Sequence, residues 1–246
     1  MTLRLVVELT EDQKARMAEL PASAWFTQVV FRNAKSPVHP VAALAENNEL
    51  KLAMVRDWIA AAVPGKRVLD LFSGNGAFSI VAALAGAREV VGVEFAEERV
   101  RCAEFVASTL QSDCRFVFKQ GDVYRIGEYF AEPFDVVLCL GGLYHIADPA
   151  FILRETGRLT RERLIMQTSQ VLPLPGNWAK FRVRPQDRTE EGLTSVRGGS
   201  GTWRYSPGCL RELLRHGGFR IVEERQPPWR MRSRFPWYLA NCEPLG

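Results

Sequence analysis

The stretch Arg67-Val68-Leu69-Asp70-Leu71-Phe72-Ser73-Gly74-Asn75-Gly76 decides the fold expected of this chain. It begins as an apolar run that carries one acid, breaks at two glycines, and continues into a run at residues 77–85 that is typical of a helix. A strand, a glycine turn and a helix in this order let a ligand approach backbone N–H groups at the helix start. Glycine is needed at 74 and 76 because a Cβ would obstruct both the tight turn and the close approach.

The residues around this turn indicate what kind of ligand it binds. A phosphate-binding turn would have a third glycine at the position that Ser79 occupies here. Asp70 would also repel a pyrophosphate, so a cationic or zwitterionic ligand fits better. A second acid, Glu94, ends the β-rich run 89–94, about twenty residues after the glycines, where an acid can accept hydrogen bonds from ribose hydroxyls.

Two further segments complete the pattern. Gln120-Gly121-Asp122-Val123 follows a third apolar run, and residues 134–140 form a fourth, which is the most apolar. Because the four segments occur in this order and spacing, the sequence resembles class I S-adenosylmethionine-dependent methyltransferases over roughly residues 45–170. The resemblance implies an α/β, Rossmann-like, seven-stranded and mostly parallel sheet, with an antiparallel last strand and helices on both faces.

The same resemblance implies a role for each segment. Asp70 and the backbone around Gly74 and Gly76 would hold the methionine part of S-adenosylmethionine, and Glu94 would take the ribose hydroxyls. Asp122 would accept a hydrogen bond from the adenine amino group, with Val123 against the ring. The whole set of expected cofactor-binding residues is Asp70, Ser73, Gly74, Gly76, Glu94, Phe95, Asp122, Val123, Cys139 and Leu140. No metal ligand is expected.

Two residues after the fourth apolar run are the candidate catalytic groups. An acceptor of high pKa needs a general base, and His145 lies just past residue 140, at the rim where an acceptor would bind. The alternative is a surface or helix-capping histidine beside Asp148. Tyr144 would line the acceptor pocket.

The phrase Gly142-Leu143-Tyr144-His145-Ile146-Ala147-Asp148-Pro149 is also similar to a narrower group, the tRNA wobble-uridine methyltransferases and their relatives. In that group's pattern Lys51 matches a carboxylate-binding lysine. A small-molecule acceptor is favoured over tRNA, because residues 170–205 are aromatic and long enough to enclose a pocket. A third hypothesis is a non-catalytic adapter that keeps the fold and the ligand for stability.

The rest of the chain gives the expected domain organisation. Residues 1–44 read as an N-terminal extension or lid, of which the first twenty look poorly anchored. Trp25, Phe26 and His39 could cover the cofactor or simply pack on the sheet. Residues 45–246 form the methyltransferase domain, which has an insertion at 170–205. No regular hydrophobic pattern is found between Thr168 and about Pro207.

Hydrophobic periodicity predicts the individual elements. Helices are expected at 45–63, 76–85, 96–107, from about 149 to 159 and at 206–216, and strands at 67–71, 89–94, 114–119, 134–140, 163–168, 219–224 and 235–242. The last two strands would form an antiparallel pair.

Composition and charge restrict the function class further. The longest apolar runs fall short of the roughly 18 residues that cross a bilayer, and the apolar core of the N-terminus is too short for a secretory signal. Five scattered cysteines without C-x-x-C spacing suit a reducing cytoplasm. Residues 151–246 carry 17 Lys and Arg against 9 Asp and Glu. That excess, which includes Arg225, Arg230, Arg232 and Arg234 around Trp229, fits either an RNA-binding surface or an ordinary solvated one.

Overall fold

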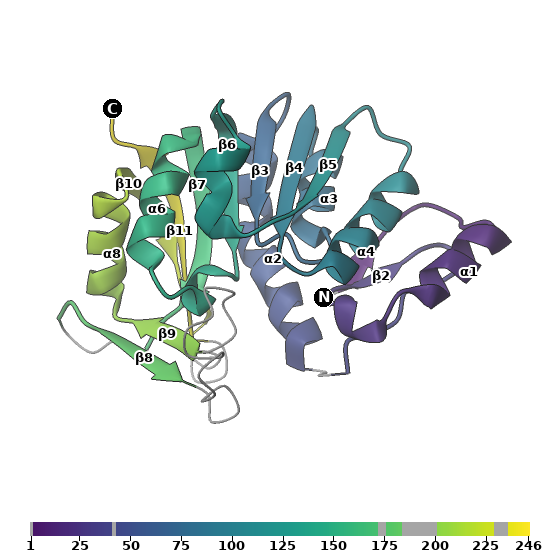
Figure 1. The fold of residues 1–246 in the computed structure, drawn as a ribbon, viewed down its shortest axis with the longest axis horizontal. Coiled ribbons are helices and arrows are strands. Elements are labelled where there is room, and N and C mark those ends of the chain that lie inside the picture. Colours follow the sequence, from purple (N-terminus) through teal and green to yellow (C-terminus); the bar gives the residue numbers. More distant parts are fainter. Residues whose placement is uncertain (1, 41–42, 172–175, 184–200, 229–235) are drawn as a thin grey trace. The chain divides into compact units, whose positions relative to one another are not determined.

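The computed structural model describes residues 2–40, 43–171, 176–183, 201–228 and 236–246. These residues form two compact units, Met1–Gly121 and Asp122–Gly246 (Figure 1). No helix of the described residues is both long enough and apolar enough to cross a membrane.

The first unit is built on three parallel strands. β3 pairs with β4, and β4 pairs with β5, so that Asp70 lies opposite Gly92 and Glu94 lies opposite Gln120. A small second sheet joins β1 and β2 in parallel. The elements of this unit are β1 (Thr2–Arg4), α1 (Glu11–Glu19), the 3₁₀ turn η1 (Ala22–Ala24), β2 (Gln28–Val30), α2 (Ala43–Ala62), β3 (Arg67–Leu71), α3 (Ala77–Leu84), β4 (Glu89–Glu94), α4 (Glu97–Ser108) and β5 (Arg115–Gln120).

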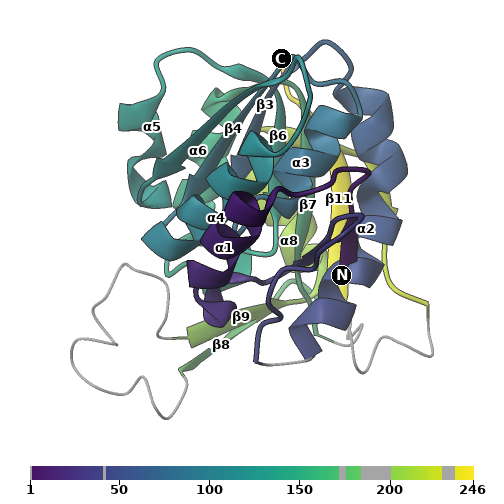
Figure 2. The ribbon, with the colours of Figure 1, turned by 90° about the vertical axis from the view of Figure 1, so that its right-hand side faces the viewer.

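The N-terminal segment is firmly held, so the prediction of a poorly anchored lead-in was wrong. Leu3, Leu5 and Leu9 are buried, and the purple N-terminal segment runs alongside α4 (Figure 2). Thr10 caps α1 in a reciprocal box with Gln13, which satisfies backbone N–H groups that a helix start leaves without partners. The apolar residues of this short segment do not follow one period for long enough to be recognised from sequence.

In the described part of the second unit, four strands lie in the order β10-β11-β7-β6, and β8 and β9 form a separate pair. β6 and β7 are parallel, whereas β11 is antiparallel to both β7 and β10. The elements of this unit are η2 (Val123–Arg125), α5 (Ile126–Tyr129), β6 (Phe134–Leu140), η3 (Leu143–His145), α6 (Pro149–Arg158), β7 (Thr160–Ser169), β8 (Ala179–Val183), β9 (Gly201–Tyr205), α8 (Pro207–His216), β10 (Phe219–Arg225) and β11 (Trp237–Pro244). Every residue of β6 is buried, as its continuous apolar run predicts.

Over the whole chain the strand order is β10-β11-β7-β6-β3-β4-β5, which confirms the predicted Rossmann-like, mostly parallel sheet with an antiparallel last strand. The expectation that no regular structure lies between Thr168 and Pro207 was wrong. β8 and β9 form an antiparallel pair there, with Phe181 opposite Trp203. Residues 172–175 and 184–200, which hold most of the prolines and glycines behind that expectation, lie outside the described residues.

Candidate functional site

The glycine turn after β3 has an unusual backbone. Phe72 has a φ of 62°, and Gly74 and Gly76 have φ values of 55° and 76°. Within the turn Gly76 N donates to Ser73 O at 2.9 Å, while Ser73 N donates to Val93 O at 3.0 Å. A positive φ is energetically costly for any residue other than glycine. The backbone of Phe72 is therefore strained, and strain of this kind clusters at functional sites.

The two glycines of the turn meet different requirements. A Cβ on Gly76 would lie 2.8 Å from Ala103 Cβ, so Gly76 lets the turn pack against α4. A Cβ on Gly74 would meet no atom within 4 Å. The space beside Gly74 is therefore open, which is what the close approach of a ligand to the backbone requires.

Asp70 is buried at the end of β3, close to a second charged group. Its Oδ2 accepts a hydrogen bond from Ser79 Oγ at 2.7 Å, and burial raises the pKa of Asp70 to about 7. Lys51 of α2 is also buried, and this lowers its pKa to about 8, although the charge of Asp70 opposes the shift. Ser79, at the position where a dinucleotide-binding turn has a third glycine, thus serves here as a hydrogen-bond donor to the acid.

Glu94 connects the turn to the start of α4. Its Oε2 accepts from Gly74 N at 3.0 Å, and its Oε1 accepts from Ala96 N at 3.0 Å and from Arg99 Nη1 at 3.2 Å. A carboxylate offers about four acceptor positions, so about one remains for a ligand hydroxyl. The negative charge of Glu94 is also one of the causes that raise the pKa of Asp70. Phe95, the next residue, is 45% exposed.

The N-terminal aromatic residues lie in two different environments. Trp25 is 1% exposed and packs edge-on against Phe105 of α4, with ring centroids 6.4 Å apart. Phe26 instead lies under the Arg99 guanidinium, which is 4.2 Å from its ring centroid, and His39 lies 4.8 Å from Phe26. Burial and the charge of Arg99 both lower the pKa of His39. The structure therefore packs Trp25 in the interior and places only Phe26 and His39 near Glu94.

Sequence reasoning missed one contact of the turn. Asn75 Oδ1 accepts from Thr27 N at 3.1 Å, and Asn75 Nδ2 donates to Thr27 O at 2.8 Å. The sequence hints at this contact only by placing an asparagine between two glycines, and an asparagine alone does not identify its partner.

The second unit holds the other candidate residues. Asp122 caps η2 through a hydrogen bond from Tyr124 N to Oδ1 at 2.9 Å, and Val123 is buried. Cys139 and Leu140 are buried in β6. Asp122 lies two residues after the end of β5, and Leu140 is the last residue of β6.

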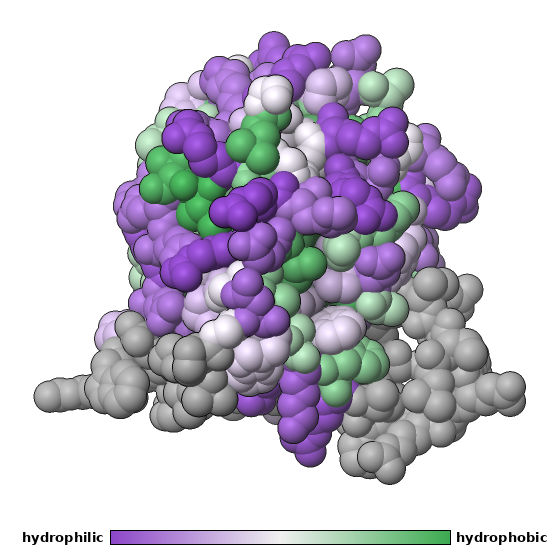
Figure 3. Space-filling view, turned by 90° about the vertical axis from the view of Figure 1, so that its left-hand side faces the viewer, coloured by the Kyte–Doolittle hydropathy of each residue, from purple (hydrophilic) through white to green (hydrophobic). Residues whose placement is uncertain are grey.

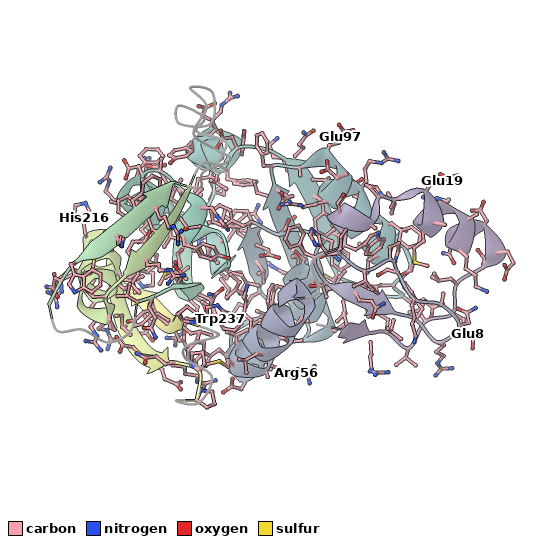
Figure 4. The ribbon with its side chains drawn as sticks, turned by 90° about the horizontal axis from the view of Figure 1, so that it is seen from below. Glu8, Glu19, Arg56, Glu97, His216 and Trp237 are labelled. Carbon is pink, nitrogen blue, oxygen red and sulfur yellow. The ribbon has the colours of Figure 1, made fainter. Side chains whose placement is uncertain are left out.

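Tyr144 and His145 lie together in η3, half-buried, with ring centroids 4.2 Å apart. The cap of α6 is Asp148, whose Oδ1 accepts from Phe151 N at 2.9 Å, so the helix-capping alternative for His145 was wrong. His216, labelled in Figure 4, ends α8, and its Nε2 lies 3.1 Å from Arg154 Nη1. Among the described residues no group of His, Cys, Asp and Glu is arranged to hold a metal ion.

Buried polar atoms without partners gather at the end of β7 and in β9. Gln170 and Tyr205 pair across a parallel bridge, and Trp203 stacks on Tyr205 with an interplanar angle of 19°. Within the described part of the chain, five buried atoms of this region make no hydrogen bond: Gln167 Oε1, Thr168 Oγ1, Gln170 Oε1, Trp203 Nε1 and Tyr205 OH. Such groups call for an explanation, because most buried polar atoms are paired.

Several arginines of the second unit are engaged in surface ion pairs. Arg211 binds Glu224 through two hydrogen bonds of 2.7 and 2.8 Å, and Arg225 binds Glu223 at 2.8 Å. The face that carries α8 and β10 is mostly hydrophilic (Figure 3). Arg230, Arg232, Arg234 and Trp229 lie outside the described residues.

Known proteins resemble this chain in both sequence and fold. Residues 62–190 match a family model described as a methyltransferase domain. The ubiquinone biosynthesis O-methyltransferase of Hahella chejuensis is 31% identical over 155 residues, which cover 63% of this chain and 58% of that protein. The chain thus spans about three-fifths of the length of the curated relatives that it matches.

Two solved structures share the fold. Magnesium protoporphyrin IX methyltransferase from Synechocystis PCC 6803, with bound S-adenosylmethionine, has a TM-score of 0.59 at 19% identity, covering 81% of this chain and 80% of that one. The N-terminal domain of EvdMO1, in the presence of S-adenosylhomocysteine and D-fucose, has a TM-score of 0.63 at 19% identity, covering 96% and 97%.

Proposed function

Because this chain belongs to the family of methyltransferase domains, we propose that it transfers a methyl group from S-adenosylmethionine to a small-molecule acceptor. The observation that carries the proposal is the glycine turn, with open space beside Gly74 and the carboxylates of Asp70 and Glu94 near it. Two neighbouring buried carboxylates favour a positively charged ligand, since a cation reduces their repulsion.

Each acid has a proposed role in holding the cofactor. Asp70 accepts hydrogen bonds from the methionine ammonium group, and Glu94 accepts one from a ribose hydroxyl at its remaining position. Ser73, Gly74, Gly76 and Phe95 line the same part of the site. Four further residues contact the adenine end and the donor methyl group of the cofactor: Asp122, Val123, Cys139 and Leu140.

The bound cofactor supplies an already activated methyl group, so the protein must mainly orient the acceptor and exclude water. His145 takes the proton from the acceptor hydroxyl as general base, and Tyr144 lines the acceptor pocket. The Hahella relative is an O-methyltransferase, and this supports an oxygen acceptor.

A small molecule is preferred as acceptor for a reason found in the second unit. Trp203 and Tyr205 offer stacked rings, and the unpaired buried atoms beside them offer hydrogen-bond positions of both kinds. A neutral ring that carries hydroxyl groups matches that combination. We place the protein in the cytoplasm, which agrees with five cysteines that form no disulfide.

Calorimetry with S-adenosylhomocysteine tests the cofactor proposal. The wild type should bind with a Kd in the micromolar range, and Asp70→Ala and Glu94→Ala should each weaken binding at least tenfold, whereas the exposed acid variant Asp113→Asn should bind as the wild type does. A wild type that does not bind, or binding that survives both site variants, would rule out the assignment.

The acceptor is tested by following S-adenosylhomocysteine release with panels of phenols, hydroxylated rings and tRNA. Turnover confined to tRNA would favour the wobble-uridine alternative, and binding of tRNA should then weaken at least tenfold between low and physiological salt, because phosphate contacts release counterions. Cofactor binding with no turnover on any acceptor would favour the adapter.

A further inference from the structure

The side-chain amide of Asn75 pairs with the backbone of Thr27 as a second peptide group would. It accepts from Thr27 N at 3.1 Å and donates to Thr27 O at 2.8 Å, across 48 residues of sequence. Asn75 is 2% exposed and Thr27 is 1% exposed, so neither bond competes with bulk water. A buried two-way pair of this kind is expensive to break, because each broken bond leaves a buried group unsatisfied.

Asn75 lies in the part of the turn that most needs support. Phe72, Gly74 and Gly76 all have positive φ values within five residues, and the conformation of Phe72 is strained. Such a backbone persists only where its surroundings fix it. β4 supplies two restraints, from Val93 O to Ser73 and from the Glu94 carboxylate to Gly74. The third restraint comes from the N-terminal segment through Asn75.

A second contact joins the same segment to the site. Phe26, next to Thr27, stacks under the Arg99 guanidinium, and Arg99 donates to the carboxylate of Glu94. Residues 26 and 27 therefore contact both the turn and the residue that orients the proposed ribose acceptor. Trp25 is buried against Phe105 of α4 and fixes where this pair of residues lies.

We propose that Asn75 is a positioning residue for the cofactor, through which the N-terminal segment, residues 25–31, holds the glycine turn in its binding conformation. The proposal rests on the proposed function above. It requires cofactor binding and the docking of residues 25–31 to favour each other to the same degree, since the coupling between two equilibria is reciprocal.

A matched control lies two residues beyond residues 25–31. Asn33 makes the same two-way pair with another backbone residue, accepting from Leu9 N at 2.8 Å and donating to Leu9 O at 2.9 Å, and none of its hydrogen bonds reaches the turn. Asn33→Ala therefore removes the same chemistry close to residues 25–31 while leaving the restraint on the turn in place.

The experiment measures the Kd for S-adenosylhomocysteine by calorimetry, together with hydrogen exchange of the amides of residues 27–30 with and without that ligand. Asn75→Ala should weaken binding by roughly ten- to a hundredfold, and the ligand should slow exchange at residues 27–30 in the wild type but not in this variant. Asn75→Asp keeps an acceptor for Thr27 N but loses the donor to Thr27 O, so its affinity should lie between that of the wild type and that of Asn75→Ala. Asn33→Ala should bind within about twofold of the wild type.

The possible failures can be told apart. A wild type that does not bind S-adenosylhomocysteine overturns the proposed function and this inference with it. If the wild type binds and Asn75→Ala binds equally well, or if Asn33→Ala loses as much affinity as Asn75→Ala, only the positioning role of Asn75 is overturned. Should Asn75→Ala fail to fold, Asn75→Asp decides the question by the same comparison, and equal affinity and equal ligand-induced protection to the wild type would refute the role.

Discussion

Alanine at Gly74 and alanine at Gly76 should damage the protein in different ways. Both positions have a positive φ, 55° and 76°, at which a Cβ costs roughly 1–2 kcal/mol. At Gly76 the new methyl would also lie 2.8 Å from Ala103 Cβ and 3.2 Å from its Cα, and overpacking of this kind adds about 1–3 kcal/mol. At Gly74 it would meet nothing within 4 Å. We therefore expect losses of unfolding free energy of about 1–2 kcal/mol for Gly74→Ala and about 2–5 kcal/mol for Gly76→Ala.

Gly74→Ala should lose less stability than Gly76→Ala, yet its affinity for the ligand should fall. Urea denaturation without ligand gives the stability, and calorimetry with S-adenosylhomocysteine gives the affinity. Gly74→Ala should lose at least tenfold in affinity, because its methyl occupies the space through which the ligand reaches the turn. Gly65→Ala is the control, since its φ of 70° is as strained and nothing lies within 4 Å, but it belongs to the turn after α2. Equal stability losses for Gly74→Ala and Gly76→Ala, or unchanged affinity in Gly74→Ala, would refute the reasoning.

Three further predictions concern single side chains. Burial raises the pKa of Asp70 from 3.8 to about 7, so between these pH values the native state holds a proton that the unfolded chain releases. The free energy of unfolding should therefore fall as the pH rises from about 4 to 7, and urea denaturation at several pH values should show that Asp70→Asn removes this fall. Tyr205→Phe deletes an unpaired buried hydroxyl and should leave the unfolding free energy unchanged or raise it by up to about 1 kcal/mol, whereas Tyr238→Phe, which removes a hydrogen bond to Glu224, should cost about 1–2 kcal/mol; equal losses would mean that Tyr205 has a partner. His145→Asn should lower kcat by roughly 10²- to 10⁴-fold with the affinity for S-adenosylhomocysteine unchanged, and an unchanged kcat would exclude His145 as the base.

Local pattern was enough to predict the sheet and the family. β4 and β6 begin and end at the predicted residues, because each is a short, continuous apolar run between clear breaks. The family could be predicted for the same reason, because its motifs lie at the ends of such strands, and the match to a methyltransferase domain confirmed it. The narrower tRNA group rests on one phrase after β6, and the comparisons do not specifically support it.

What could not be predicted depends on contacts distant in sequence. The pairing of Asn75 with Thr27 spans 48 residues, and the packing of Leu3, Leu5 and Leu9 depends on neighbours that no local period reveals. β8 and β9 were missed because the prolines and glycines in the sequence around them dominated the pattern. Phe72 has no sequence signal for its positive φ, since that conformation is imposed by its surroundings.

The position of β11 has a consequence for how the chain is made. Among the described strands β10 pairs with β11 alone, and β11 also pairs with β7, although β11 follows both of them in the sequence and is synthesised after them. Until residues 237–244 have been synthesised, β7 has an open edge and β10 has no strand to join, and such edges attract other chains. A nascent chain that stalls before Trp237 should therefore depend on chaperones to stay out of aggregates, whereas β11, once made, covers the edge of β7 and gives β10 a partner.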